Sequence, residues 1–333
     1  MLRRLFALVG MTTAVPPGTG ESACRFVSSR GILRSCDSHA RRPRSSDGSI
    51  PRDLRRGLRT ARVVYLCTDM VSQFVQEHLP RRSTPFTLVT GDSDLAVAAG
   101  PIAERVLDAL TSHPMLVAWY AQNRVFRHPK LHSMPIGLDY HTLSPPEGGR
   151  RAHPWGARRV PVDQERQLLQ VGRSAGSIAA KEPLAFCNWH FAIERGDRQE
   201  CRRQVDPRVV SYQSDFTTRD ASWRMNARCA FTLSPAGAGL DCHRTWEALL
   251  LGSIPVVLRS PLDELFARLP VVIVDDWSEV APTRLRSELD RIARGSFDFS
   301  QLELSYWTAR IQSQPIREGL PLRYDDFLSS LAE

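Results

Sequence analysis

Lysine is almost absent from this chain, although the chain is strongly basic. Only Lys130 and Lys181 occur among its 44 basic residues, and the other 42 are arginine. The arginines are spread along the 333 residues, and no aromatic-rich RNA-binding motif accompanies them. The net charge of +8 therefore indicates codon bias and a solvated surface, and we expect no nucleic-acid partner.

The seven cysteines lack the spacing of a metal site. No Cys-x-x-Cys occurs and the number is odd, so we expect no metal ligands among them. Cys67 and Cys229 lie in apolar runs, where buried thiols are common. Cys24 and Cys36 could pair as a disulfide in an oxidising compartment, but two reduced thiols are the simpler interpretation.

No apolar run is long enough to span a bilayer, so we expect no stable membrane span. Arg3 and Arg4 precede a mildly apolar stretch at residues 5–15. This stretch is typical either of a short signal-peptide core, with a cleavage zone near Ala23, or of a frayed first element, which we favour slightly. The compartment is therefore cytoplasmic or, if the stretch is a signal, the Golgi or secretory lumen.

Strand-like and helix-like segments alternate along the chain, which is typical of an α/β fold. In the first half we expect a strand and a turn over 24–33, strands over 62–66, 85–89, 116–120 and 131–135, and helices over 69–79 and 102–110. In the second half we expect strands over 184–187, 209–210, 230–233, 254–258 and 271–274, and helices over 163–175, 195–204, 222–227, 283–293 and 306–312. A Pro/Gly/Arg-rich stretch at 144–155 separates the two halves.

The most informative segment runs from residue 229 to residue 277. Its strand over 230–233 leads into a Pro/Gly loop and then a helix that Asp241 is expected to cap. Gly252 is placed to end this helix, and Pro261 to open the next one. The order strand, loop, helix, strand, helix, strand predicts an open parallel sheet that binds ligands at its loop-to-helix turns.

The loop of this segment predicts an anion site. Ser234, Gly237 and Gly239 bring backbone N–H groups close to the start of a helix, where the helix dipole also favours negative charge. A tight turn that merely requires glycine is the alternative explanation.

Three charged side chains share one side of the following helix, since Asp241, Arg244 and Glu247 are three residues apart. The planar guanidinium of Arg244, near the start of the helix, suits a diphosphate. Glu247 could accept hydrogen bonds from ribose hydroxyls. A helix cap at Asp241 and a surface ion pair between Arg244 and Glu247 are the structural alternatives.

A dinucleotide-binding fingerprint is incomplete in the same loop. Cys242 stands at the third glycine position, and the next strand ends at Arg259 instead of an acidic residue. Because an arginine there could meet a 2′-phosphate, an NADP-dependent reductase is kept as an alternative of lower rank.

The run Ser234-Pro-x-Gly-x-Gly-x-Asp-x-x-Arg-x-Trp-Glu-Ala-Leu, followed by Gly-x-Ile-Pro-Val, resembles the signature of the exostosin family of glycosyltransferases. The segment at residues 269–277 also resembles the continuation of that family's pattern. The resemblance covers about fifty residues of the second half and none of the first.

The resemblance implies a GT-B architecture, an α/β fold in which two Rossmann-like parallel-sheet domains face a cleft. Residues 1–143 would form the acceptor-side domain, 144–180 a linker and 181–333 the donor domain. The implied activity is that of a hexosyltransferase-like enzyme, which transfers a sugar with inversion and without a metal ion. The donor would be a nucleoside-diphosphate sugar, with UDP as the expected nucleotide. The acceptor would be a glycan or a glycosylated molecule, and no cofactor beyond the donor is implied.

The resemblance also assigns roles to residues of the signature. Arg244 would neutralise the diphosphate as it leaves, Glu247 would hold the ribose and Asp241 would support the loop. Ser234, Gly237 and Gly239 would line the diphosphate. Residues 134–139 are similar to the hinge segment of other GT-B enzymes, with isoleucine in place of an asparagine.

The base that activates the acceptor is expected after the strand over 85–89, where Asp92 and Asp94 lie in a polar turn. In a GT-A enzyme this Asp-x-Asp spacing would carry manganese, but here the donor signature lies elsewhere. A plain Asx-turn is the alternative.

His190 and Arg195 follow the first strand of the second half and could reach the donor. A non-catalytic glycan- or polyanion-binding protein of the same fold is the second rival function.

Overall fold

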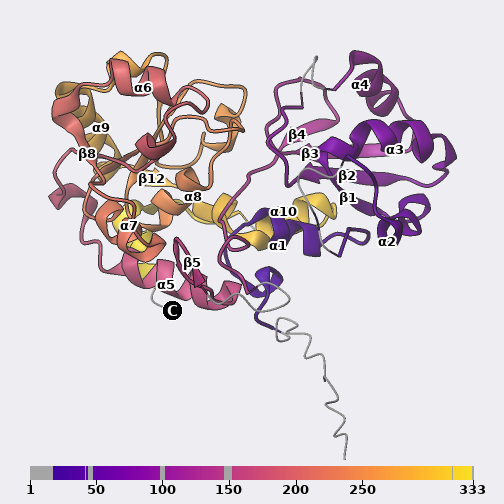
Figure 1. Ribbon diagram of the computed structural model, residues 1–333, viewed down its shortest axis with the longest axis horizontal. Coiled ribbons are helices and arrows are strands. Elements are labelled where there is room, and N and C mark those ends of the chain that lie inside the picture. The colour runs from indigo at the N-terminus through magenta and orange to yellow at the C-terminus, as the bar shows by residue number, and fades with distance from the viewer. Residues whose placement is uncertain are drawn as a thin grey trace, which may run out of the picture.

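The computed structural model describes residues 18–41, 43, 48–97, 102–145, 152–316 and 318–331, so the stretch at 5–15 lies outside the described residues. The chain is an α/β protein with two parallel sheets in two lobes (Figure 1), as expected for two Rossmann-like domains. Within the described ranges, no helix is long and apolar enough to cross a membrane.

The first lobe is built on a four-stranded sheet in the order β1-β2-β3-β4, in which all neighbours are parallel. Every residue of β1 and β2 is buried, because helices cover a parallel sheet on both faces. The strands are β1 (Val63–Cys67), β2 (Phe86–Gly91), β3 (Leu116–Ala121) and β4 (Leu131–Ser133). The helices are α2 (Arg52–Arg55), α3 (Val71–Glu77) and α4 (Glu104–Thr111).

The second lobe is built on a five-stranded sheet in the order β11-β10-β9-β7-β8, again parallel throughout. Its strands are β7 (Ala185–Cys187), β8 (Val210–Tyr212), β9 (Phe231–Leu233), β10 (Ile254–Leu258) and β11 (Val272–Val274). Its helices are α5 (Pro161–Arg173), α6 (Arg198–Gln204), α7 (Arg219–Asn226), α8 (His243–Leu250), α9 (Pro282–Arg294) and α11 (Tyr324–Ser330). Short antiparallel pairs join β5 (Ala152–His153) to β6 (Gly156–Ala157) and β12 (Ser296–Phe297) to β13 (Leu322–Arg323).

Two helices far apart in the sequence pack together. Helix α10 (Leu304–Ile311) lies beside α1 (Ser29–Arg34), as the adjoining yellow and indigo ribbons show (Figure 1). Leu304 N donates to Arg25 O at 2.9 Å, and Val27 N donates to Leu302 O at 2.8 Å. The segment before α11 therefore crosses to the first lobe and returns.

Two local expectations are wrong. The stretch 24–33 holds helix α1 and not a strand, because the Ser28 hydroxyl caps the helix by accepting from Gly31 N at 3.1 Å. Pro261 opens only a 3-10 turn (Asp263–Leu265), since the Asp263 carboxylate accepts from Ser260 N at 2.8 Å and closes the turn locally.

Candidate functional site

A pocket of about 380 Å³ lies at the carboxyl end of the five-stranded sheet. Asn188 follows β7 directly and Gln213 follows β8, and both line the pocket. Helix α8 contributes Arg244 and Glu247 from its first two turns. This is the edge at which open parallel sheets bind ligands.

One wall of the pocket carries three guanidinium groups, those of Arg195, Arg198 and Arg244. None of the three forms an ion pair with a carboxylate among the described residues, whereas Arg219 on the same pocket lies 3.9 Å from an oxygen of Asp139. Burial, together with the positive charges of Arg244 and Arg195, lowers the pKa of Arg198. The wall therefore has positive charge that the protein does not balance, which favours an anionic ligand.

Arg244 is held in place by neutral acceptors only. Its Nε donates to Asn188 Oδ1 at 3.2 Å, and its Nη1 lies 3.4 Å from Pro235 O and from Ser234 Oγ. These bonds fix the direction of the guanidinium without neutralising it. Its charge therefore stays available to a ligand.

Aromatic rings also line the pocket. Phe191 is 45% exposed and Phe216 is 58% exposed, and their ring centroids are 6.1 Å apart. Trp155, from the turn between β5 and β6, is also exposed and lines the same pocket. Large aromatic side chains left open at a pocket mouth indicate a platform for a flat or sugar ring.

The structure brings three of the expected donor residues together. Arg244 and Glu247 line the pocket, and Ser234 lies buried behind Arg244 with its hydroxyl 2.8 Å from that of Thr245. The Glu247 carboxylate accepts from Trp223 Nε1 at 3.1 Å, and burial raises the pKa of Glu247.

The two loop glycines are used for close approach. A Cβ built on Gly239 would lie 2.8 Å from Asn123 Nδ2, so only glycine lets this residue of the first lobe come so near. A Cβ on Gly237 would lie 3.1 Å from the guanidinium Nη2 of Arg198. Gly237 therefore faces the cationic wall, and Gly239 faces the other lobe.

Asp241 does not cap helix α8, contrary to expectation. The N-cap is Cys242, which makes no side-chain cap. The Asp241 carboxylate accepts from Trp246 Nε1 at 2.9 and 3.0 Å and from Ile136 N at 2.7 Å, while Asp241 N donates to Asn123 Oδ1 at 2.9 Å. Asp241 thus joins the signature loop to the first lobe.

The two residues expected to supply the base lie outside the pocket. Asp92 is buried with φ 51°, its N–H donates to Gln122 Oε1 at 2.9 Å, and its carboxylate lies 3.7 Å from Arg30. Asp94 is exposed. Neither aspartate lines the pocket.

A cluster that the sequence did not predict lies at the edge of the pocket. Asp139, His141 and His243 are grouped so that their potential ligand atoms lie within 4.8 Å of one another, and such a set could also hold a metal ion. His141 Nδ1 is 3.2 Å from Asp139 Oδ1. Burial opposes ionisation of Asp139, but the charges of the two histidines and Arg219 prevail and hold its pKa below the usual range.

Arg259, the residue weighed for a 2′-phosphate, already has carboxylate partners. Arg259 pairs with Asp275 and, at 3.1 Å, with Asp263, so its guanidinium is already neutralised. These contacts disfavour a 2′-phosphate site at Arg259.

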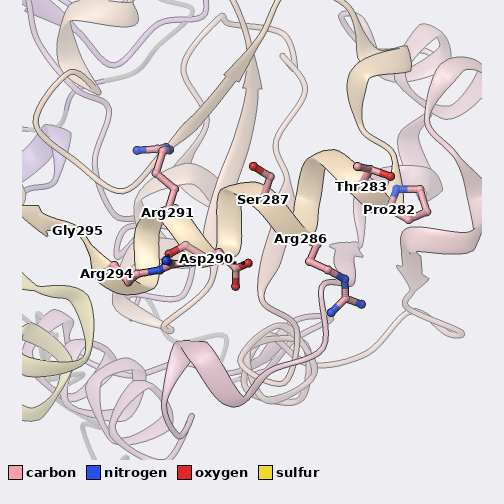
Figure 2. A pocket seen from close by; sticks show the side chains of 8 residues that line it. All are labelled: Pro282, Thr283, Arg286, Ser287, Asp290, Arg291, Arg294 and Gly295. Carbon is pink, nitrogen blue, oxygen red and sulfur yellow. Dashed lines mark hydrogen bonds and ion pairs between the residues drawn. The ribbon is translucent and has the colours of Figure 1, made fainter.

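A wider hollow of about 830 Å³ lies along the outer face of helix α9 (Figure 2). Its arginines stand on one helix, and Arg291 and Arg294 pair with Glu288 and Asp290 respectively. Because it is an exposed helix surface with its charges largely balanced, we do not take it as the functional site.

Sequence reasoning missed Asn188, Arg198, Phe216 and the Asp139 cluster. Asn188 could have been found from the rule that ligands lie at the carboxyl ends of parallel strands. Nothing in the local sequence marks Phe216. Asp139 ends the hinge-like segment at 134–139, but no sequence spacing relates it to His243. The chain matches no protein-family model, and no curated protein matches its sequence.

Proposed function

We propose that this chain is a GT-B glycosyltransferase of the exostosin type. It transfers a sugar from a nucleoside-diphosphate sugar, with UDP as the expected nucleotide, to a glycan or glycosylated acceptor. The transfer is inverting, and arginines in place of a metal ion neutralise the departing diphosphate. The donor occupies the pocket at the carboxyl end of the five-stranded sheet.

The observation that carries this proposal is the cationic wall of Arg195, Arg198 and Arg244 without carboxylate partners. A diphosphate supplies the missing negative charge and matches planar guanidinium groups. The unfilled N-terminus of α8 adds further positive potential beside Arg244. The charge that develops on the leaving diphosphate is stabilised by the same groups.

The rest of the pocket suits the other parts of such a donor. Phe191 and Phe216 offer faces for the nucleobase, since an aromatic ring stacks on any base. Glu247 is a hydrogen-bond acceptor near the cationic wall, as a ribose hydroxyl requires. A cavity of about 380 Å³ is of the size that small-molecule ligands occupy.

Calorimetric titration of the full chain with UDP tests this proposal. We expect Arg244→Ala to weaken binding about 10- to 100-fold, the cost of a lost charge-assisted hydrogen bond. Arg286→Ala removes the same charge from the outer face of α9 and should leave affinity unchanged.

Two results would reject the proposal. Binding of NADPH but not of any nucleoside diphosphate would favour a reductase. Salt-sensitive binding of a sulfated glycan without turnover of any nucleotide sugar would favour a non-catalytic binding protein.

A further inference from the structure

We infer that His243 is the general base that takes the proton from the acceptor hydroxyl, with the Gly137 carbonyl fixing its orientation. The inference rests on the proposed glycosyl transfer and replaces the expected role of Asp92 and Asp94. It starts from the position of His243, which immediately precedes Arg244 on α8 and lines the same pocket.

The tautomer of His243 follows from its contact with the backbone. Its Nδ1 lies 2.7 Å from Gly137 O, and a carbonyl oxygen can only accept a hydrogen bond. Nδ1 therefore carries the hydrogen, and Nε2 of the neutral ring keeps its lone pair. No hydrogen bond of Nε2 occurs among the described residues, so this lone pair is free to accept a proton.

Charged neighbours suit the protonated form that the reaction would create. Asp139 lies in the same cluster and lines the same pocket, and the Arg219 guanidinium at 3.9 Å and the Thr142 N–H, which donates to Asp139 at 3.0 Å, favour its ionised form. An ionised carboxylate beside an imidazole stabilises the imidazolium. His141 lies against the same carboxylate, with Nδ1 3.2 Å from Oδ1, and burial lowers the pKa of His141. Arg219 faces the cluster from α7 and also pairs with Asp139.

The expected alternatives are less suited to this task. Asp94 is exposed, the Asp92 carboxylate lies 3.7 Å from the Arg30 guanidinium, and neither aspartate lines the pocket. His243 and Arg244 both line the pocket, so a donor that fills the pocket would contact both side chains.

The acceptor oxygen forms a bond to the anomeric carbon while the bond from that carbon to the diphosphate oxygen breaks. The electron pair of the broken bond leaves with the nucleoside diphosphate, which Arg244 stabilises. The hydroxyl proton passes to Nε2 of His243.

The test uses the full chain and a panel of UDP-, GDP- and dTDP-sugars, with water or added monosaccharide as acceptor. His243→Asn keeps an N–H group for the Gly137 carbonyl but has no base. We expect nucleotide release to fall about 10²- to 10⁴-fold, while the Kd for UDP changes less than about twofold. His39→Asn is the matched control, since the His39 ring also contacts a backbone carbonyl, that of Ala40, away from the pocket.

Chemical rescue separates a base from a structural role. Added imidazole should restore part of the turnover of His243→Ala, because it can fill the space and accept the proton. In long-range ¹H–¹⁵N spectra of the free protein, His243 should show hydrogen on Nδ1. Hydrogen on Nε2 in the neutral ring, or unchanged turnover in His243→Asn, overturns the inference while the proposed function stands.

Two further results are also decisive. If the wild-type chain neither binds UDP nor releases it from any donor, the proposed function fails and the inference fails with it. If EDTA abolishes turnover, and Mn²⁺ or Zn²⁺ binds the wild type but not His243→Asn, the cluster is a metal site and His243 is not the base.

Discussion

The carboxylate of Asp241 holds the indole of Trp246 with two hydrogen bonds of 2.9 and 3.0 Å, although the sequence suggested that Asp241 would cap a helix. The same carboxylate accepts from Ile136 N of the other lobe at 2.7 Å. A single buried acid therefore sets the entry to α8, on which His243 and Arg244 lie. Of the charged signature residues, Asp241 connects the two lobes, and Arg244 and Glu247 line the pocket.

Asp241→Asn should destabilise the fold by about 1–3 kcal/mol, because the amide nitrogen that replaces one carboxylate oxygen would face the N–H donors of Trp246 or Ile136. Urea unfolding of the full chain measures the loss. Asp94→Asn is the control, since Asp94 is exposed, and it should stay within about 0.5 kcal/mol of the wild type. Equal stability of both variants would show that the Asp241 contacts contribute little.

Stability should depend on pH through Glu21. Burial raises the pKa of Glu21 from 4.5 to about 7, with opposing contributions from Ser28 and Arg30. The folded protein thus binds this proton more tightly than the unfolded chain does. The stabilisation that protonated Glu21 gives to the folded state is complete below about pH 4.5 and is lost as the pH rises towards 7.

Glu21→Gln removes this dependence. Between pH 4.5 and 7, the stability of the wild type relative to the variant should fall by up to about 3 kcal/mol. Urea unfolding across this range measures the difference. A difference that is flat or rises with pH would contradict the raised pKa.

Gly239→Ala should destabilise the contact between the lobes, because the added Cβ would lie 2.8 Å from Asn123 Nδ2. The expected loss is about 1–3 kcal/mol, as for other overpacked sites, and thermal unfolding reports it. Gly20→Ala has open space around its Cβ and serves as the control. If both variants melt together, Asn123 moves aside at little cost.

Phe216→Ala should weaken binding of UDP by about 1–3 kcal/mol, provided that the nucleobase stacks at the pocket mouth. Leu320→Ala removes an exposed apolar side chain away from the pocket and should have no effect on titration with UDP. An unchanged affinity in Phe216→Ala would move the base away from this ring.

Much of the sheet architecture could be predicted from the sequence. Continuous apolar runs such as the one that forms β10 (Ile254–Leu258) indicate strands buried on both faces, and the expected bounds match the structure there. Gly252 also ends its helix as expected, with φ 68°. These features depend on local chemistry, which a sequence displays directly.

The rest depends on contacts between distant segments. Helix α1 packs against α10, which is far from it in the sequence, and no local sequence pattern predicts this contact. Asp241 has the local spacing of a cap, but the Ile136 N–H and the Trp246 indole bind it more fully. The sequence predicted only part of the arginine wall, because Arg198 belongs to the wall through its position beside Arg244, which the sequence does not show.

Release of UDP from UDP-sugars by the full chain, compared with Arg244→Ala and Arg286→Ala, tests the central claim most directly. The account predicts steady release by the wild type and by Arg286→Ala, loss of release in Arg244→Ala, and a sugar product whose anomeric configuration is inverted relative to the donor. Absence of release from every UDP-, GDP- and dTDP-sugar, or equal release by all three proteins, would contradict it.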